Sequence, residues 1–406
     1  MAYLLSGDVA TFSADRGQVF YFSPSISGDP RIALKNSNTD FGAKYGIAIS
    51  NDRLKIYLAS SGSPYIRILN VSTGVLDSNP ASVPAAFATS CFLNSDGSEL
   101  CVTNFGSSGT GTIVRYDTSN MSKLTDPSTW PTGLPRKGDY SSDDVWLAIP
   151  HETTPYITIY ERGTMTKISN PATLPANTGL SAKFSPDNAF LAVGGVGNPS
   201  LRIYDTSNWS SVSLTTNITI QISQLAWSPD GSKLAVGSEN SPYIAVYNTS
   251  NWTQITLPSF SAYQMQRICG LHWLNNDVLL GGIDFVSVRQ SAFITIDITN
   301  TSVLNYQTNG LQGIGLYGLA FTNGMAYRTL SGTVVDTSSP PDGLERTVRA
   351  YDRQNGSILA ETVSASDGTF ELVVYTSSPC YVVALGADGS PNEISKIVDR
   401  VGPIST

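Results

Sequence analysis

The chain contains few histidines, the side chain best suited to acid–base chemistry near neutral pH. Its 406 residues include only two histidines, His151 and His272. His151 follows a proline and precedes Glu152, a pairing that could hold a ligand but that is more often solvated surface. His272 lies in a short apolar stretch, where a hydrogen-bonded strand histidine is the favoured interpretation. The histidines therefore predict no catalytic centre.

Acidic residues cluster once, at Asp139, Asp143 and Asp144, a grouping that suggests a Ca²⁺ site. The group lacks the alternating oxygen ligands of a Ca²⁺ loop, so we interpret these residues as turn residues. The sequence also contains no nucleophile elbow, phosphate-binding loop or dinucleotide-binding glycine motif. We therefore predict that the protein is not an enzyme and that it uses no cofactor and no metal.

Two of the four cysteines, Cys91 and Cys101, are symmetric about Asp96 in one expected hairpin, so they could face each other. Directly opposed residues on paired strands rarely meet disulfide geometry, which favours small apolar core residues instead. Whether the two are bonded is left open at this stage. No cysteine shows the spacing of zinc ligands.

Trp209 and Trp252 follow equivalent Thr-Ser-Asn turns and could bind sugar by stacking. Because both occupy one repeat position, packing at the outer edge of the repeat is the favoured interpretation. The abundant Asn-x-Ser/Thr triplets are interpreted in the same way, as repeated turn chemistry.

One phrase repeats along the chain, and it is clearest at 224–252 and 181–209. A short apolar strand leads into a Pro-Asp-Gly type turn, a second strand returns, and a third ends in Tyr-Asp/Asn-Thr-Ser-Asn. Strands are favoured because the segments are short and rich in β-formers, and no long helical periodicity occurs. Structural turn residues mark the repeats at intervals of 43 to 47 residues; they are Asp52, Asp96, Asp143, Asp187, Asp230 and Asn276.

The Ser228–Gly231 turn and the Leu-Ala-Val-Gly strands resemble WD40 and YVTN-type β-propellers, whose four-stranded blades have this period. The Gly-His and Trp-Asp pairs of true WD40 blades are missing. We predict an all-β chain in which residues 1–329 form a seven-bladed β-propeller, with eight blades as the alternative. The last blade would combine Leu319–Phe321 and Met325–Arg328 with strands between Val9 and Leu34. His272 would then share the position of Lys183 and Ala226, facing the channel or a blade face.

After Arg328 the pattern changes to short alternating strands. The Ser331-Gly-Thr-Val opening, the Val348-Arg-Ala-Tyr strand and the 366–372 hairpin resemble the transthyretin-like, carboxypeptidase-regulatory-like family. This resemblance implies that residues 330–406 form a non-catalytic, seven-stranded-type β-sandwich. Such modules, often closing on a phrase like Asp399-Arg400-Val401, are similar to those of bacteriophage virion proteins.

A net charge of −8 argues against nucleic-acid binding. No apolar run approaches a membrane span, and the first residues do not read as a signal peptide, so no membrane insertion is expected. We predict a structural and interaction protein of a bacteriophage virion, tail- or capsid-associated and made in the host cytoplasm. Its partners would be other virion proteins in a homo-oligomer or multi-copy assembly. The alternatives are an adhesin for host-surface glycans and a lactonase-like propeller enzyme.

Overall fold

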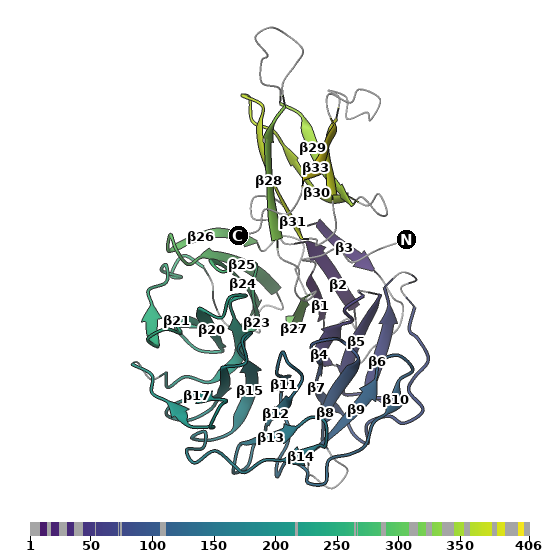
Figure 1. Ribbon diagram of the computed structural model, residues 1–406, viewed down its shortest axis with the longest axis vertical. Helices are drawn as coiled ribbons and strands as arrows, with labels where there is room; N and C mark the ends of the chain where they lie inside the picture. Colours follow the sequence, from purple (N-terminus) through teal and green to yellow (C-terminus); the bar gives the residue numbers. More distant parts are fainter. Residues whose placement is uncertain are drawn as a thin grey trace. The chain divides into compact units, whose positions relative to one another are not determined.

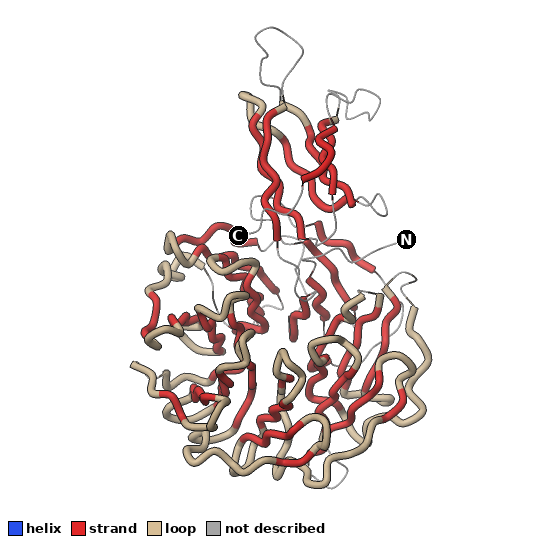
Figure 2. Tube along the Cα trace, viewed as in Figure 1, coloured by secondary structure: helices blue, strands red, loops and turns tan. Residues whose placement is uncertain are grey.

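The computed structural model consists of strands and loops, with no helix in the part it describes (Figure 2). Its described residues offer no helix that is long and apolar enough to cross a membrane. The described ranges are 9–13, 18–23, 31–35, 44–52, 54–71, 73, 75–105, 111–215, 218–263, 265, 267–285, 290–307, 316–321, 327–334, 345–352, 358–375, 380–385 and 397–401.

The chain divides into two compact units, of which the first covers Asp8–Phe321 and the second Thr322–Thr406. The first unit holds seven small antiparallel sheets, which follow one another along the chain (Figure 1). The first three contain β27 (Leu316–Phe321), β1 (Val9–Ser13), β2 (Gln18–Ser23) and β3 (Arg31–Lys35); β4 (Lys44–Ile49), β5 (Lys55–Ser60) and β6 (Ile66–Asn70); and β7 (Ala88–Leu93), β8 (Glu99–Asn104), β9 (Thr112–Asp117) and β10 (Ser122–Lys123).

The remaining four sheets of this unit each hold four strands in chain order. They contain β11 (Asp139–Tyr140), β12 (Trp146–Pro150), β13 (Ile157–Glu161) and β14 (Thr166–Lys167); β15 (Gly179–Phe184), β16 (Phe190–Gly195), β17 (Leu201–Asp205) and β18 (Ser211–Val212); β19 (Ile222–Trp227), β20 (Lys233–Ser238), β21 (Ile244–Asn248) and β22 (Thr253–Ile255); and β23 (Arg267–Trp273), β24 (Val278–Phe285), β25 (Gln290–Asp297) and β26 (Ser302–Gln307).

One sheet joins strands from the two ends of the first unit, because β27 pairs antiparallel with β1. The segment Met325–Arg328 was predicted to join this sheet as well. Instead, Tyr327 and Arg328 begin β28 (Tyr327–Thr333), which pairs with β31 (Thr369–Tyr375) in the second unit. The prediction that strands from the two ends pair is therefore confirmed. The prediction that Tyr327 and Arg328 join the same sheet is wrong.

The first strands of successive sheets contact one another. Tryptophans reinforce two of these contacts: Trp227 Nε1 donates to the Lys183 carbonyl, and Trp273 Nε1 donates to the Ala226 carbonyl, each at 3.0 Å. The pairs in contact are β27 with β4, β4 with β7, β7 with β11, β11 with β15, β15 with β19, β19 with β23, and β23 with β27.

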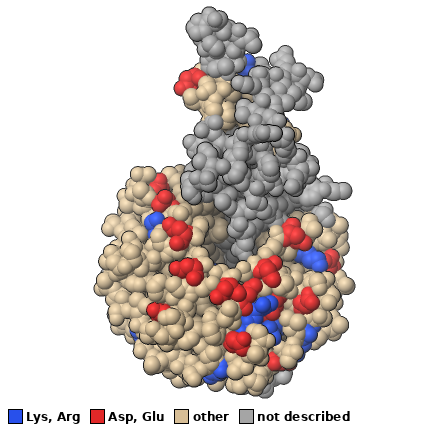
Figure 3. Space-filling model, in the orientation of Figure 1, with Lys and Arg blue, Asp and Glu red and all other residues tan. Residues whose placement is uncertain are grey.

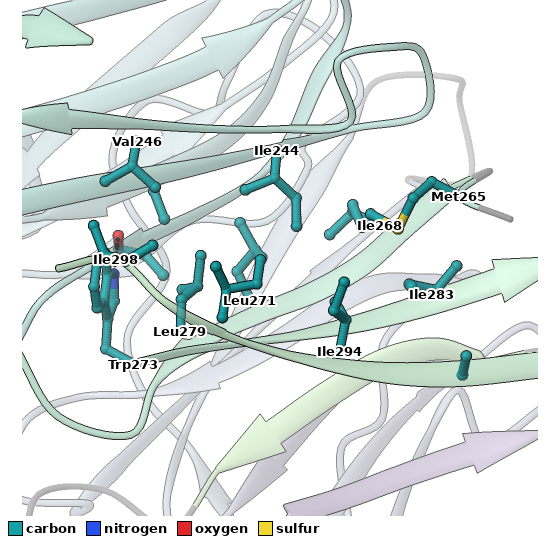
Figure 4. Close-up of a cluster of buried hydrophobic side chains, with 14 residues drawn as sticks. Ile244, Val246, Met265, Ile268, Leu271, Trp273, Leu279, Ile283, Ile294 and Ile298 are labelled. Atoms are coloured by element: carbon teal, nitrogen blue, oxygen red, sulfur yellow. Dashed lines mark hydrogen bonds between the residues drawn. The ribbon is translucent and has the colours of Figure 1, made fainter. Parts of the chain in front are cut away.

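Apolar side chains fill the space between neighbouring sheets. Strands of these sheets are buried on both faces, so they read as nearly continuous apolar runs such as β20 and β16. Figure 4 shows one such cluster, in which Ile244 and Val246 of one sheet face Leu271, Leu279 and side chains of the next. Each sheet thus depends on its neighbours to bury its faces.

Cys91 and Cys101 are free and buried, as the core interpretation predicted. They do not face each other, because Cys91 pairs with Val102, and Cys101 pairs with Phe92. A shift of one residue sends a side chain to the opposite face of a sheet. The two thiols accordingly lie in different core clusters, which a disulfide could not bridge without moving the backbone.

The second unit has six strands in its described residues. They form a two-stranded sheet of β28 and β31 and a four-stranded sheet of β30 (Ile358–Val363), β29 (Thr347–Asp352), β32 (Cys380–Ala384) and β33 (Ile397–Val401). Val348, Ala350 and Val382 are buried in this unit. The predicted boundary after residue 329 falls inside β28.

Candidate functional site

The first strands of four successive sheets bring together a group of polar side chains. We call it the polar cluster; it comprises Lys137, Asp139, Lys183, Gln224 and His272. Lys137 lies just before β11, and its backbone N–H and carbonyl bond to β15 at 3.3 and 2.9 Å. Lys183 and Lys137 are both exposed, so water reaches the cluster.

Asp139 forms the ion pair at the heart of this cluster. Its Oδ1 lies 2.7 Å from the Lys183 Nζ, and its Oδ2 accepts a 2.9 Å bond from the Phe184 N–H. Burial raises the pKa of the Asp139 carboxyl, and the Lys183 ammonium opposes this shift. The pair joins β11 to β15 and leaves no oxygen of Asp139 without a partner.

Lys137 reaches past the neighbouring sheet. Its Nζ donates to Gln224 Oε1 at 3.3 Å, although Gln224 belongs to β19, two sheets further along the chain. The protein around this ammonium limits its hydration and lowers the pKa of Lys137 to about 8, with the Lys183 charge adding to the effect. Lys137 therefore loses its charge more readily than an ordinary lysine.

His272 occupies the repeat position of Lys183 and Ala226, as the sequence predicted. Lys183 pairs with Ala192, Ala226 pairs with Ala235, and His272 pairs with Leu280 in the corresponding registers. His272 is half-buried, and burial together with the Lys183 charge lowers the pKa of its imidazole to about 3. The imidazole is therefore neutral at physiological pH.

The charge of the polar cluster limits its chemistry. Two ammonium groups, Lys137 and Lys183, surround one carboxylate, and His272 is neutral. A divalent cation would have to displace the Lys183 ion pair and face a second ammonium. Neither the polar cluster nor any other part of the described ranges gathers three or more histidine, cysteine or carboxylate side chains that could hold a metal ion. The cluster can join strands electrostatically, but it is a poor cation site.

His151 differs from its prediction as a solvated loop residue. It is completely buried, and its Nε2 lies 3.0 Å from Thr158 Oγ1, while its Nδ1 has no hydrogen-bond partner. Burial lowers the pKa of His151 to about 4. The adjacent Glu152 forms an ion pair with Arg136 instead. His151 is thus a core residue: it directly follows β12 and forms a β-bridge with Pro135 of the preceding linker.

The predicted turn aspartates share one geometry. Asp230 Oδ1, for example, accepts from Ser228 Oγ at 2.7 Å and from the Ser232 N–H at 3.0 Å, closing the turn with its own side chain. Asp52, Asp96, Asp143 and Asp187 accept the equivalent pair of bonds. In the last turn Asn275 takes this role, and Asn276 has a different one.

Hydrogen bonds also join several of the described turns to the turn of a neighbouring sheet; we call these the inter-turn bonds. Asp144 accepts from the Ser95 N–H at 2.9 Å and from Asn94 Nδ2 at 3.0 Å, so both of its carboxylate oxygens bond to the neighbouring turn. Asn276 Oδ1 accepts from the Asp230 N–H at 3.0 Å. The others are Asn51 Nδ2 to the Ser95 carbonyl at 3.0 Å and the Ser142 N–H to Asn188 Oδ1 at 2.7 Å.

The tryptophans that the sequence offered for sugar stacking pack against aromatic rings. Trp252 is 7% exposed and lies edge-on to Phe190, with ring centroids 5.2 Å apart. Trp209 is half-buried and lies edge-on to Trp146 at 5.4 Å. Trp252 therefore has almost no free face for a sugar ring, whereas the half-buried Trp209 keeps part of its ring accessible.

Sequence reasoning missed Lys137 and Gln224 as members of the polar cluster. A signal was present for the ion pair, because Asp139 and Lys183 stand at the same register position of successive repeats with opposite charges. No such signal was present for Lys137, because its contact with Gln224, two sheets further along the chain, depends on the three-dimensional arrangement. Figure 3 shows that most of the described surface in this view is uncharged, which makes the cluster unusual.

Comparison with known proteins leaves the resemblances as predictions: no protein-family model matches the chain, and no curated protein is a significant relative.

Proposed function

We propose that the first unit is a seven-bladed β-propeller and that the second is a transthyretin-like β-sandwich. The proposal for the first unit is supported by seven successive sheets, by the pairing of β27 with β1, and by the chain of contacts among first strands that returns from β23 to β27 and β4. The two sheets of the second unit, with their buried valines, support the second part.

We further propose that the protein is a non-enzymatic structural and interaction component of a bacteriophage virion. The observation that carries the first part is the set of inter-turn bonds. They use the Asp144 carboxylate and the side-chain amides of Asn188 and Asn276 to hold neighbouring sheets together. Side chains committed in this way stiffen a scaffold, which then presents its other loops to partners. The virion assignment derives from the resemblance of the C-terminal residues.

The two alternatives fit the geometry less well. A lactonase-like enzyme would need a cation site among the first strands of the sheets, and the ammonium groups of Lys137 and Lys183 make the polar cluster there unfavourable for a metal ion. An adhesin that stacks sugar on Trp252 would need a ring face that the structure buries.

Mass spectrometry of density-purified phage particles from the source tests the virion assignment. The expected result is the intact chain in multiple copies per particle, together with capsid or tail proteins. Its absence from intact particles would overturn the assignment. Amide hydrogen exchange tests the stiff scaffold separately: the Ser95, Ser142 and Asp230 N–H groups should exchange slowly, and fast exchange at all three would contradict it.

A further inference from the structure

A tyrosine holds the linker that precedes each of several sheets. Tyr204 lies opposite Leu191 in its sheet and is completely buried, and its hydroxyl donates to the Thr173 carbonyl at 2.8 Å. Tyr116 and Tyr160 stand at the same register position and donate to the carbonyls of Ser82 and Thr129, also at 2.8 Å. These hydroxyls fix each linker to the sheet that follows it.

The sheet of β23 to β26 departs from this pattern. Its equivalent residue is Ile296, which pairs with Leu279 and is completely buried. Isoleucine has no hydroxyl, so it cannot anchor the preceding linker, residues 256–265, in this way. This sheet therefore lacks a contact that three others make. The β4–β6 sheet lacks the hydroxyl as well, because Leu69 stands at its equivalent position, opposite Ile56.

A cavity of about 750 Å³ lies under that same linker. Ile244 and Met265 line it and also belong to the apolar cluster of Figure 4, where both side chains lie near Ile268. The linker that precedes β23 thus lacks the tyrosine hydroxyl and also covers the cavity. Its size is typical of a small-molecule site.

The walls of the cavity combine aromatic rings with neutral polar groups. Tyr243, Phe260 and Tyr263 are each half-buried, so each keeps part of a ring accessible. Tyr263 is held by Tyr306, with ring centroids 4.8 Å apart. Gln254 is exposed at the rim and offers an amide donor and acceptor.

The residues that line the cavity indicate the chemical class of its ligand. No charged side chain is among the described lining residues, so an ionic ligand would lose hydration without gaining a partner. The hydroxyls of Ser259 and Ser261 bond to each other at 3.0 Å, but a purely apolar ligand would cover the Gln254 amide without giving it a partner. A pyranose ring has an apolar face of C–H groups and a rim of hydroxyls, and it matches both kinds of wall.

We propose that this cavity binds a neutral saccharide, with Phe260 and Tyr263 against the ring face and Gln254 bonded to ring hydroxyls. The saccharide site is independent of the virion assignment, because purified particles could contain the chain whether or not it binds sugar. It also differs from the stacking site expected at Trp209 and Trp252.

The test uses the full chain on a glycan array that carries neutral and sialylated oligosaccharides, followed by titration calorimetry with the best neutral hit. We expect binding to neutral glycans, weakened at least tenfold by Phe260→Ala, a half-buried position whose truncation should spare the fold. Trp209→Ala is the matched control, since it removes an aromatic ring outside the cavity, and its affinity should stay unchanged.

Ile296→Tyr supplies a second test, because it restores the hydroxyl that anchors the other linkers and should abolish binding by closing the cavity. Circular dichroism and thermal unfolding establish that each variant is folded. A silent array, a preference for sialylated glycans, unchanged affinity in Phe260→Ala, or loss of binding in Trp209→Ala would each overturn the site.

Discussion

Two junctions between neighbouring sheets use one repeat position for opposite chemistry. Glu99 and Phe190 both begin the second strand of a sheet, paired with Asp117 and Asp205. Phe190 stacks on Trp227 of the next sheet, with centroids 6.3 Å apart. Glu99 is 3% exposed and receives a hydrogen bond from Tyr140, which stands where Trp227 does.

The charged junction is completed by two arginines. Arg115 Nη1 lies 2.8 Å from Glu99 Oε1, and Arg162 Nε donates to Glu99 Oε2 at 3.1 Å from the next sheet. The aromatic junction is completed by Trp252, edge-on to both Phe190 and Trp227. The repeat therefore fixes the backbone and the depth of burial, while the chemistry that joins two sheets is free to vary.

Removing the buried carboxylate should have the largest effect. Glu99→Leu leaves Arg115, which is 7% exposed, without its charge partner. We expect the free energy of unfolding of the first unit to fall by about 3–5 kcal/mol, the usual cost of breaking a buried pair from one side. Urea denaturation followed by tryptophan fluorescence measures it.

Phe190→Leu is the matched control at the same repeat position. It keeps an apolar side chain among apolar neighbours, so it should cost less than about 1.5 kcal/mol. Equal losses in the two variants would mean that the junctions do not differ as described.

His151 also differs from the residues at its repeat position, and this difference predicts that stability depends on pH. Its backbone N–H bonds to the Tyr156 carbonyl, as Ser60 bonds to Tyr65 and Ser238 to Tyr243, so it replaces a serine of other repeats. Burial lowers the pKa of His151 to about 4 from an ordinary 6.5. The unfolded chain therefore binds a proton first, and stability is full above pH 6.5 and falls as the pH drops to 4.

The expected loss over that window is about 3 kcal/mol from this residue. Denaturation at a series of pH values, with His151→Ser as the comparison, isolates the contribution, because His272 and the carboxylates titrate in both proteins. The variant should show a smaller decline below pH 6.5. Parallel curves for the two proteins would refute a neutral, buried His151.

The sheets could be predicted from the sequence because neighbouring residues determine where their turns fall. Turns such as the one at Asp230 close with their own side chains, so their positions can be predicted from neighbouring residues. The contacts of Glu99 could not be predicted, because Arg162 is 63 residues away and belongs to another repeat.

The position of Cys101 shows a second limit, which is register. Symmetry about Asp96 suggested that Cys101 faces Cys91, but the pairing is offset by one residue and separates them. The sequence contained a signal for the cavity, because Ile296 occupies the position that Tyr204 and Tyr160 occupy in aligned repeats. That substitution becomes informative only once the hydroxyl is known to hold a linker.

The smallest effect concerns the tyrosine hydroxyls themselves. Tyr204→Phe keeps the buried ring and removes only the bond to the Thr173 carbonyl. We expect a loss of about 1 kcal/mol in the free energy of unfolding, the usual contribution of one such bond. Tyr116→Phe and Tyr160→Phe should each cost about the same, and because the three act on separate linkers, the triple variant should lose about the sum. Urea denaturation measures all four proteins. Negligible losses would show that the hydroxyls do not hold the linkers, and would remove the contrast with Ile296 on which the origin of the cavity depends.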